Sequence, residues 1–338
     1  APNAIDSAQK NCLIYLIERS AFENAERTAL SFNGESIGYG ELLQRSSRLA
    51  GALQEKGGET STIVGIHVKN PLSAICSMIG VMKLGASYLP IDSEYPEKRV
   101  NFILEDSNAS HLICDSADLV KIDDANNISI VETSILTSDT NFTFTAIEGS
   151  RDLKNVANVI YTSGSTGNPK GVIVSQENLT DYFNGFIANS EVSSCDSFAL
   201  LSTLSADLGS TVLFSSLILG AHLHTFEMDQ LRDADFMQNY LEEYSIDCFK
   251  IVPSHWRGLS YNEALLPKKM VVFGGEELTP TMVERIKTAN DSLAIYNHYG
   301  PTETTIGKLM HRVDTSKAYG TIPLGKPFSN NKVYVFDS

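Results

Sequence analysis

Short apolar runs and longer amphipathic stretches follow one another along this chain, and their periods predict its elements. Helical spacing places Ile75, Ile79 and Met82 on one face of a helix predicted over 72–82. Compact apolar runs with strand character occupy six segments: 62–67, 157–162, 171–174, 247–251, 270–273 and 293–295. The alternation of strands and helices predicts an α/β protein with layered sheets.

Capping and turn residues mark some of the boundaries between these elements. Asp233 or Asp235 can cap a helix whose apolar residues have helical spacing over 236–244. Asn33-Gly34 lies between two short apolar runs and predicts a hairpin turn. We find no internal repeat and no interdomain linker.

The segment 161–172, Tyr-Thr-Ser-Gly-Ser-Thr-Gly-Asn-Pro-Lys-Gly-Val, has the composition of a phosphate-binding loop between two strands. Glycines let backbone N–H groups turn toward an anion, hydroxyls add donors, and Lys170 adds a point charge. The spacing does not fit G-x-x-x-x-G-K-[ST], because Pro169 separates the loop from the lysine. A Ser/Gly-rich linker is the alternative, although linkers seldom lie between two apolar strands.

The segment 296–305, Tyr-Asn-His-Tyr-Gly-Pro-Thr-Glu-Thr-Thr, follows the apolar run 293–295. It therefore lies where a strand ends and a turn begins, which is where open α/β sheets bind ligands. An aromatic ring at Tyr299, a hydroxyl at Thr302 and a carboxylate at Glu303 suit a nucleotide with Mg²⁺. Taken alone, Gly-Pro-Thr-Glu is also an ordinary turn.

In this order the two segments resemble the adenylate-forming superfamily and, within it, the adenylation domains of nonribosomal peptide synthetases. Three further stretches resemble the same family: 37–42 its "LTYxEL" block, 82–99 its "KAGGAYLPIDPxYPxxR" block and 273–276 its "GGE" turn. The resemblance runs from about Leu16 to the end of the chain. It implies that 1–338 forms the layered α/β sheets of the family's large N-terminal subdomain, with the start of a small β-barrel near Thr321.

The resemblance also implies an ATP site. Adenine is expected between the 274–276 turn and the ring of Tyr299, with Asn297 near its exocyclic amine. Thr302 is expected near the α-phosphate and Glu303 on Mg²⁺, and these two are the implied catalytic residues. The full set implied to bind the nucleotide is Thr162, Ser163, Gly164, Thr166, Lys170, Gly274, Gly275, Glu276, Asn297 and Tyr299.

Family members line their amino-acid pocket from four places, and the matching positions can be read here. They are Asp207, Leu208, Thr211, Lys250, Val272, Gly274, His298, Ile306 and Gly307. Read in chain order, these residues give the string Asp-Leu-Thr-Lys-Val-Gly-His-Ile-Gly, which resembles that of domains that activate aspartate. Asparagine and β-methylaspartate remain alternatives.

The chemistry of this set agrees with the resemblance. Asp207 would pair with the α-ammonium of an amino acid, while Lys250 and His298 would meet an acidic side chain, the histidine as donor or second cation. Gly274 and Gly307 would leave room. Without the resemblance, a lysine in a strand more often has its head in water, and a lone histidine is usually a satisfied polar residue.

The composition of the chain argues against some classes of binding partner. The net charge of −15, from 26 basic and 41 acidic residues, argues against nucleic acid or an anionic membrane as partner. Five scattered cysteines without a zinc-like spacing indicate reduced, mostly buried thiols in a cytoplasmic protein. No apolar run approaches membrane length and the N-terminus lacks a signal-peptide pattern.

The chain ends before the family's "TGD" aspartate and before its small C-terminal subdomain. We therefore expect either a fragment of a larger synthetase or an interrupted domain, weakly active or inactive in isolation. The leading hypothesis is ATP-dependent amino-acid adenylation followed by transfer to a peptidyl carrier protein thiol. An acyl- or aryl-CoA ligase is disfavoured by Asp207, since its substrates have no ammonium, and a non-catalytic binding fragment is the third alternative.

Overall fold

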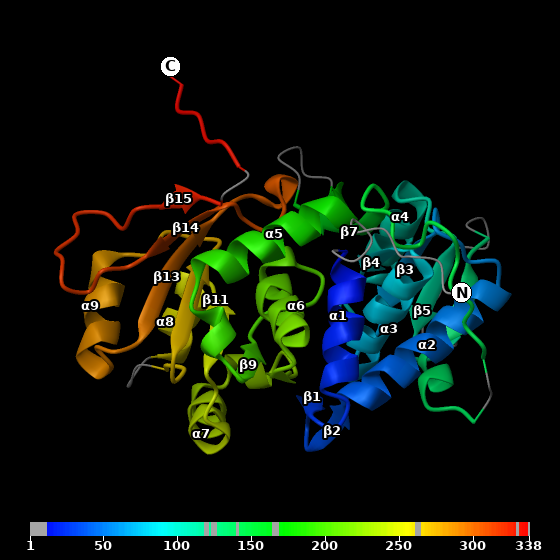
Figure 1. The fold of residues 1–338 in the computed structure, drawn as a ribbon, viewed down its shortest axis with the longest axis horizontal. Helices are drawn as coiled ribbons and strands as arrows, with labels where there is room; N and C mark the ends of the chain where they lie inside the picture. Colours follow the sequence, from blue (N-terminus) through cyan, green and yellow to red (C-terminus); the bar gives the residue numbers. More distant parts are fainter. Residues whose placement is uncertain are drawn as a thin grey trace. The chain divides into compact units, whose positions relative to one another are not determined.

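The computed structural model describes residues 12–117, 122, 127–139, 142–163, 169–260, 265–328 and 331–336. They form two compact units, whose elements are labelled in Figure 1. The first unit takes the described residues up to Thr180 together with Leu204–Ala206, and the second takes the rest. The boundary falls inside one helix, α5 (Gln176–Asn189), which explains why no linker is visible in the sequence.

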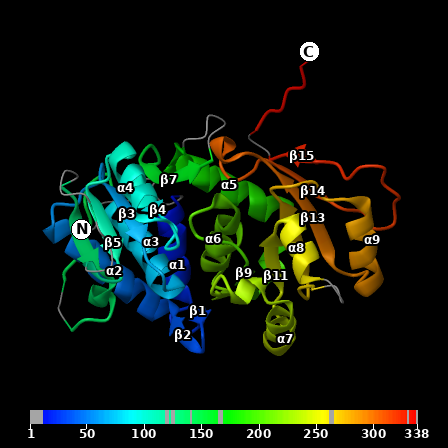
Figure 2. The ribbon, with the colours of Figure 1, turned by 180° about the vertical axis from the view of Figure 1, so that it is seen from behind.

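The first unit is built on a sheet with the strand order β6-β5-β3-β4-β7-β8, parallel except for β8, which runs antiparallel to β7. Helices α1, α2 and α3 pack together in this unit (Figure 2). Its helices are α1 (Leu13–Glu23), α2 (Tyr39–Glu55), α3 (Pro71–Leu84), α4 (Glu97–Asp106) and the 3-10 helix η4 (Thr133–Leu136). Its strands are β1 (Thr28–Phe32), β2 (Glu35–Gly38), β3 (Ile63–His67), β4 (Ser87–Pro90), β5 (His111–Cys114), β6 (Ser129–Glu132), β7 (Val156–Thr162) and β8 (Lys170–Ser175).

The helix predicted over 72–82 is confirmed as α3. The Asn70 side chain accepts from the backbone N–H of Ser73 at 3.1 Å, Pro71 occupies the first turn, and Gly85 ends the helix at φ 80°. Nearly every side chain of α3 is buried, not one face alone, because the helix is covered by its neighbours as well as by the sheet.

The predicted hairpin at Asn33-Gly34 is also confirmed. Both residues have positive φ, 48° and 81°, and β1 and β2 pair antiparallel around them. Strands β7 and β8, on either side of the glycine-rich segment, also pair antiparallel, and Thr162 lies opposite Lys170. The predicted phosphate loop therefore connects two strands of one hairpin.

The second unit is built on strands in the order β15-β14-β13-β12-β11-β9-β10. Strands β10, β9, β11, β12 and β13 are parallel, and β14 and β15 continue antiparallel. Its helices are α6 (Ser210–Leu219), α7 (Ala234–Tyr244), α8 (Pro253–Leu259) and α9 (Pro280–Ala289), with 3-10 turns η5 (Val192–Ser194), η6 (Asp207–Gly209), η7 (Gln230–Arg232) and η8 (Thr302–Thr304). Its strands are β9 (Ser197–Leu200), β10 (His222–His224), β11 (Cys248–Ile251), β12 (Met270–Gly274), β13 (Ala294–Tyr299), β14 (Leu309–Arg312) and β15 (Lys326–Pro327).

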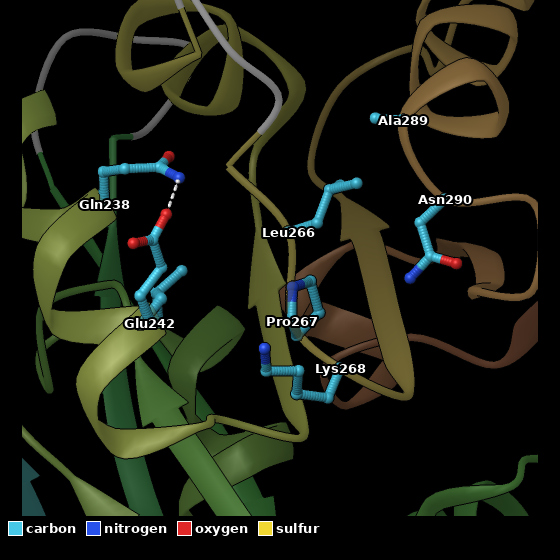
Figure 3. Close-up of a pocket in the computed structure, with 8 residues that line it drawn as sticks. Gln238, Glu242, Leu266, Pro267, Lys268, Ala289 and Asn290 are labelled. Atoms are coloured by element: carbon cyan, nitrogen blue, oxygen red, sulfur yellow. Dashed lines mark hydrogen bonds between the residues drawn. The ribbon is translucent and has the colours of Figure 1, made fainter.

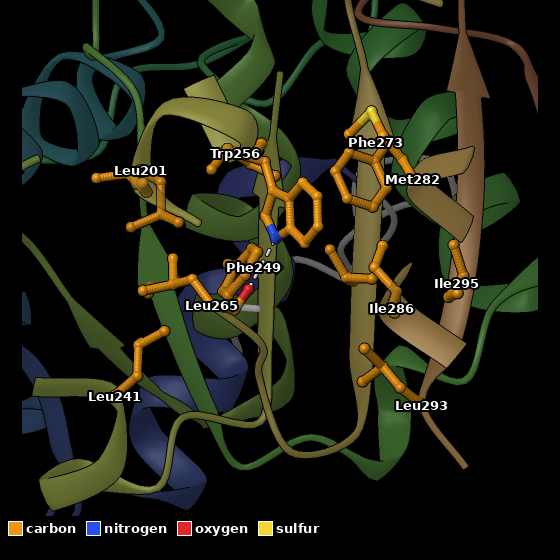
Figure 4. Close-up of a cluster of buried hydrophobic side chains, with 14 of the residues drawn as sticks. Leu201, Leu241, Phe249, Trp256, Leu265, Phe273, Met282, Ile286, Leu293 and Ile295 are labelled. Carbon is orange, nitrogen blue, oxygen red and sulfur yellow. Dashed lines mark hydrogen bonds between the residues drawn. The ribbon is translucent and has the colours of Figure 1, made fainter. Parts of the chain in front are cut away.

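Alternate residues of the central strands face opposite sides of this sheet. Phe249, Phe273 and Ile295 belong to a hydrophobic cluster with residues of α7, α8 and α9 (Figure 4). Within that cluster the Trp256 indole N–H donates to the Leu265 carbonyl at 2.8 Å. Lys250 alternates with the cluster residues and therefore faces the other side, which carries the candidate site.

Other expectations are settled by the same structure. Asp233, not Asp235, caps α7, since its side chain accepts from Phe236 N–H. All five cysteines are buried and form no disulfide with one another. Where a β-barrel was expected to begin, the described residues form the short strand β15 on the edge of the sheet, and they form no closed barrel. No helix in the described segments has the length and apolar character needed to cross a membrane.

Candidate functional site

Strand register brings the predicted pocket residues of β11, β12 and β13 to one face of the second unit's sheet. Lys250 lies opposite Val272, and Gly274 lies opposite His298. Val272 and Gly274 are two residues apart and so point to the same side. All four lie toward the carboxyl ends of parallel strands, the edge where open α/β sheets bind ligands.

Lys250 is the dominant charge of this face. Its side chain is only 1% exposed, and Nζ donates to the Thr211 hydroxyl at 2.9 Å. Burial lowers the pKa of this ammonium to about 7, against the opposing charge of Asp207. The alternative in which a strand lysine has its head in water is therefore wrong here.

Among the described residues, Asp207 provides the carboxylate that acts on the pKa of Lys250. Burial raises the pKa of Asp207, while a hydrogen bond from the Thr302 side chain and the charge of Lys250 oppose the rise. Its Oδ2 atom is buried and has no hydrogen-bond partner among the described residues. A buried carboxylate oxygen without a donor is costly, so this atom is suited to a donor or cation brought by a ligand.

His298 is buried and neutral. Burial first, and then the charge of Lys250, lower its pKa well below the ordinary value. This direction argues against a role as a second cation, because desolvation and the neighbouring lysine both disfavour the protonated imidazole; the role stays a prediction. The expectation that it serves as a hydrogen-bonding group is consistent with the structure.

The two glycines are required by the side chains of the site itself. A Cβ on Gly307 would overlap the His298 ring, and a Cβ on Gly274 would lie 3.1 Å from the Lys250 Cε. They therefore leave room for Lys250 and His298. The missing side chains at Gly274 and Gly307 make space first for these two residues, and only in addition for a ligand.

One residue of this site is absent from the sequence-based set. Tyr182, on α5, is fully buried and its hydroxyl lies 2.7 Å from Thr211 Oγ1 and 3.3 Å from His298 Nε2. Its ring packs edge-on against His298. The aromatic residues at 182, 183 and 186 were a signal of a buried helix face, but nothing local indicated which element that face would meet.

The loop after β13 carries local strain beside the site. Thr305 and Ile306 both have positive φ, 69° and 63°, and Gly307 N–H bonds back to the Thr305 carbonyl. A β-branched residue such as Ile306 rarely adopts this conformation, and such strain concentrates at functional sites. The Ile306 backbone in turn hydrogen-bonds Asp207.

The residues expected to hold adenine also lie in the second unit. Tyr299 ends β13 with its side chain 49% exposed, as a stacking ring needs to be. Gly275 has φ 86°. Glu276 accepts hydrogen bonds from both the backbone and the hydroxyl of Ser254, so it caps α8. Strand β13 continues through Tyr299, four residues beyond the predicted apolar strand 293–295.

Asn297 differs from the other members of the adenine set. It is buried, and its Nδ2 donates to the Pro323 carbonyl at 2.9 Å. Its amide nitrogen therefore has a protein partner, and contact with an exocyclic amine would use the amide oxygen. Its role at adenine stays a prediction.

The phosphate-loop residues belong to the first unit. Thr162 ends β7, Ser163 follows it exposed, and Lys170 begins β8 with its side chain exposed. The remaining two predicted members, Gly164 and Thr166, lie outside the described residues. Thr162 and Lys170 frame the two ends of the loop.

The carboxylates near the candidate site suit a metal ion that takes most of its ligands from the substrate and from water. Glu303 is exposed in η8, next to Thr302. In the part of the chain that the structure describes, no three His, Cys, Asp or Glu side chains gather as a metal cluster. Mg²⁺ is typically held by one or two carboxylates plus phosphate oxygens and water, so a single exposed carboxylate fits it.

The open pocket in Figure 3 is a different region of the second unit. It has a volume of about 500 Å³, and Gln238 at its rim donates to Glu242 at 2.7 Å. It contains none of the predicted residues.

Comparison with known proteins gives the family. The family model described as AMP-binding enzyme matches residues 17–338, so the chain belongs to this family. The chain is 33% identical to Surfactin synthase subunit 2 of Bacillus subtilis (strain 168) over 326 residues, which cover 93% of this chain and 9% of that protein. It is 31% identical to Bacitracin synthase 2 of Bacillus licheniformis over 335 residues, 98% of this chain and 12% of that protein. The chain thus spans about a tenth of the length of these relatives.

Solved structures agree on the fold. The chain is similar to the N-terminal subdomain of Klebsiella oxytoca NpsA in complex with 3-hydroxyanthranilyl-AMSN, with a TM-score of 0.81 and 21% identity over 94% of this chain and 80% of that one. It is also similar to the nonribosomal peptide synthetase FmoA3 in an AMPPNP-bound form, with a TM-score of 0.85 and 21% identity over 97% and 36%. The predicted fold, the large N-terminal subdomain of adenylate-forming enzymes, is confirmed.

Proposed function

We propose that this chain activates an amino acid with ATP, forming aminoacyl-AMP and pyrophosphate, and that the amino acid is L-aspartate. The observation that supports aspartate best is the buried pair of unlike charges, Lys250 and Asp207, of which Asp207 Oδ2 has no partner in the described residues. Family membership supports the activation chemistry.

Charge cancellation selects the substrate. A dicarboxylic amino acid brings an α-ammonium, a reacting carboxylate and a side-chain carboxylate to a desolvated site, where each needs an opposite partner. Asp207 Oδ2 takes the ammonium, and Lys250 takes the side-chain carboxylate. His298, being neutral, adds a hydrogen bond and no charge. Asparagine would leave the buried ammonium of Lys250 without a counter-charge.

The reaction consists of attack by a substrate carboxylate oxygen on the α-phosphorus of ATP, with pyrophosphate as leaving group. Thr162, Ser163, Gly164, Thr166 and Lys170 bind the phosphates. Thr302 lies close to Asp207, so the anchor for the ammonium and the hydroxyl near the α-phosphate belong to one small region. The protein positions the two reactants and neutralises developing charge.

Glu303 is the chain's ligand for Mg²⁺, whose charge, when bound, neutralises phosphate oxygens. Tyr299 stacks on adenine beside the turn formed by Gly274, Gly275 and Glu276. Transfer to the thiol of a peptidyl carrier protein, with the neighbouring domains of a nonribosomal peptide synthetase, completes the proposed role. These partners rest on the named relatives alone.

The test is amino-acid-dependent ATP–pyrophosphate exchange, measured on this chain and on the intact protein with all proteinogenic amino acids and β-methylaspartate. We expect aspartate to exceed asparagine, because only aspartate brings a carboxylate that can balance the ammonium of Lys250. β-Methylaspartate carries the same charges, so only pocket volume separates it from aspartate. A preference for asparagine or an apolar amino acid would refute aspartate and leave adenylation standing.

A further inference from the structure

Four side chains from four elements form one hydrogen-bonded series in the second unit. Lys250 Nζ on β11 donates to Thr211 Oγ1 on α6 at 2.9 Å. Thr211 Oγ1 lies 2.7 Å from the Tyr182 hydroxyl on α5, and that hydroxyl lies 3.3 Å from His298 Nε2 on β13. All four side chains are buried, so bulk water does not compete for these contacts.

The direction of the series follows from its first member. An ammonium can only donate, so Thr211 must turn a lone pair toward Lys250. The positive charge favours hydroxyl dipoles that point away from it, and neighbouring hydrogen bonds reinforce one direction. In that direction Thr211 donates to Tyr182, and Tyr182 donates to His298 Nε2.

We propose that Tyr182 is a positioning residue that holds His298 as the neutral imidazole protonated on Nδ1, leaving Lys250 as the single cation of the pocket. A nitrogen that accepts from Tyr182 cannot carry the proton, so the proton must be on the other ring nitrogen. The tautomer follows from the hydrogen-bonded series together with the charge of Lys250 at its end. Its consequence for substrate choice rests on the proposed function.

Packing keeps the Tyr182 hydroxyl in place. The ring lies edge-on to Phe183 at 4.9 Å and stacked with Phe186 at 6.1 Å, on the same helix, and contacts Phe328 at 6.0 Å. These apolar rings offer the hydroxyl no other polar group. Burial also raises the pKa of Tyr182 above its ordinary value, so the phenol keeps the proton it donates.

The consequence is a pocket with one positive charge for one side-chain carboxylate. A charged His298 would add a second cation, which a single carboxylate could not balance. A neutral His298 with its proton on Nδ1 instead offers directional hydrogen bonding next to Lys250. Tyr182 thereby makes the choice between an acidic side chain and its amide depend on Lys250 alone.

The first test reads the tautomer without any substrate. ¹⁵N spectra of the histidine-labelled intact protein distinguish the two ring nitrogens, and His298→Gln assigns the signal. We expect an unprotonated Nε2 and a protonated Nδ1 in the parent and a change in this pattern in Tyr182→Phe. Tyr296→Phe is the matched control, because its hydroxyl accepts from Glu191 N–H at 3.2 Å and takes no part in the series. A proton on Nε2, an imidazolium at neutral pH, or an unchanged pattern in Tyr182→Phe would overturn the proposal.

The second test measures selectivity by pyrophosphate exchange. Tyr182→Phe should lower the aspartate-to-asparagine ratio of kcat/KM by roughly tenfold, the effect of losing one hydrogen bond in a charged series, while the KM for ATP stays the same. Thr211→Val removes the contacts of Thr211 with Lys250 and Tyr182 but keeps Tyr182 beside His298, so it should lower the ratio while preserving the tautomer of His298. A ratio no more affected than in Tyr296→Phe would refute the effect on selectivity. If the parent uses no dicarboxylic amino acid, the proposed function fails, and the tautomer measurement still decides the role of Tyr182.

Discussion

Both units contain charged side chains that are largely shielded from solvent, but the partners of these side chains differ. In the first unit, Glu18 accepts from Lys83 at 2.7 Å and from Arg151 at 2.5 Å, so each of its oxygens has a cationic partner. In the second unit, Lys250 reaches a hydroxyl and not a carboxylate, and Asp207 keeps a buried oxygen with no partner in the described residues.

This difference in partners distinguishes a charged cluster that stabilises the fold from one that binds a ligand. A buried charge whose partners are all present stabilises a particular packing, and no ligand is needed to balance it. A buried charge with incomplete partners destabilises the ligand-free protein, and a ligand that completes it recovers that free energy on binding. The perturbed pKa of Lys250, lowered to about 7, reports this incomplete state.

The largest effect is expected from Asp207→Asn. The change keeps the shape and removes the charge that would face the substrate ammonium, and losing one partner of a buried charge pair costs about 2–5 kcal/mol. Pyrophosphate exchange with every amino acid should therefore fall by about a hundredfold or more. The free energy of unfolding is measured beside activity, because Asp207 also supplies a counter-charge to Lys250. Unchanged activity would show that the orphan oxygen does not mark a binding site.

Lys250→Met should remove the preference for aspartate over asparagine and leave ATP affinity intact. Methionine fills a similar volume without charge. The measurement is kcat/KM for both amino acids, with ATP affinity by calorimetry as control. Retention of the preference would mean that another group recognises the side chain.

Glu18→Gln tests the other half of the comparison. It leaves Lys83 and Arg151 without their carboxylate, so the free energy of unfolding should fall by about 1–3 kcal/mol. Amino-acid selectivity should stay the same. Denaturant unfolding of this variant beside Lys250→Met checks the contrast; a larger loss in the lysine variant would reverse the assignment of structural and binding charges.

The smallest effect is the pH dependence. The pKa of Lys250 is lowered to about 7, so its ammonium is lost as the pH rises through that value. Aspartate needs the ammonium, and its KM should rise about fivefold between pH 7 and pH 8, since one pKa unit corresponds to about 1.36 kcal/mol. Asparagine should show no such rise. Equal pH profiles for the two amino acids would exclude Lys250 as the titrating group.

Local patterns in the sequence determined much of the molecule. Period and capping predicted α3, α7 and the hairpin at Asn33-Gly34, because each depends on residues within a few positions of one another. The motifs around 161–172 and 296–305 predicted the family, which the match over 17–338 confirms. Lys250 was singled out by its position in a pattern and not by any property of its neighbours along the chain.

Only the tertiary structure determined the burial, the protonation and the contacts of those residues. Burial of Lys250, the neutrality of His298 and the unpartnered oxygen of Asp207 depend on which strands and helices pack together. Tyr182 belongs to the site because the fold brings its hydroxyl beside Thr211 and His298. Desolvation and hydrogen bonding act between residues far apart in the chain, so local spacing predicts the elements while only their packing sets charge, protonation and contact.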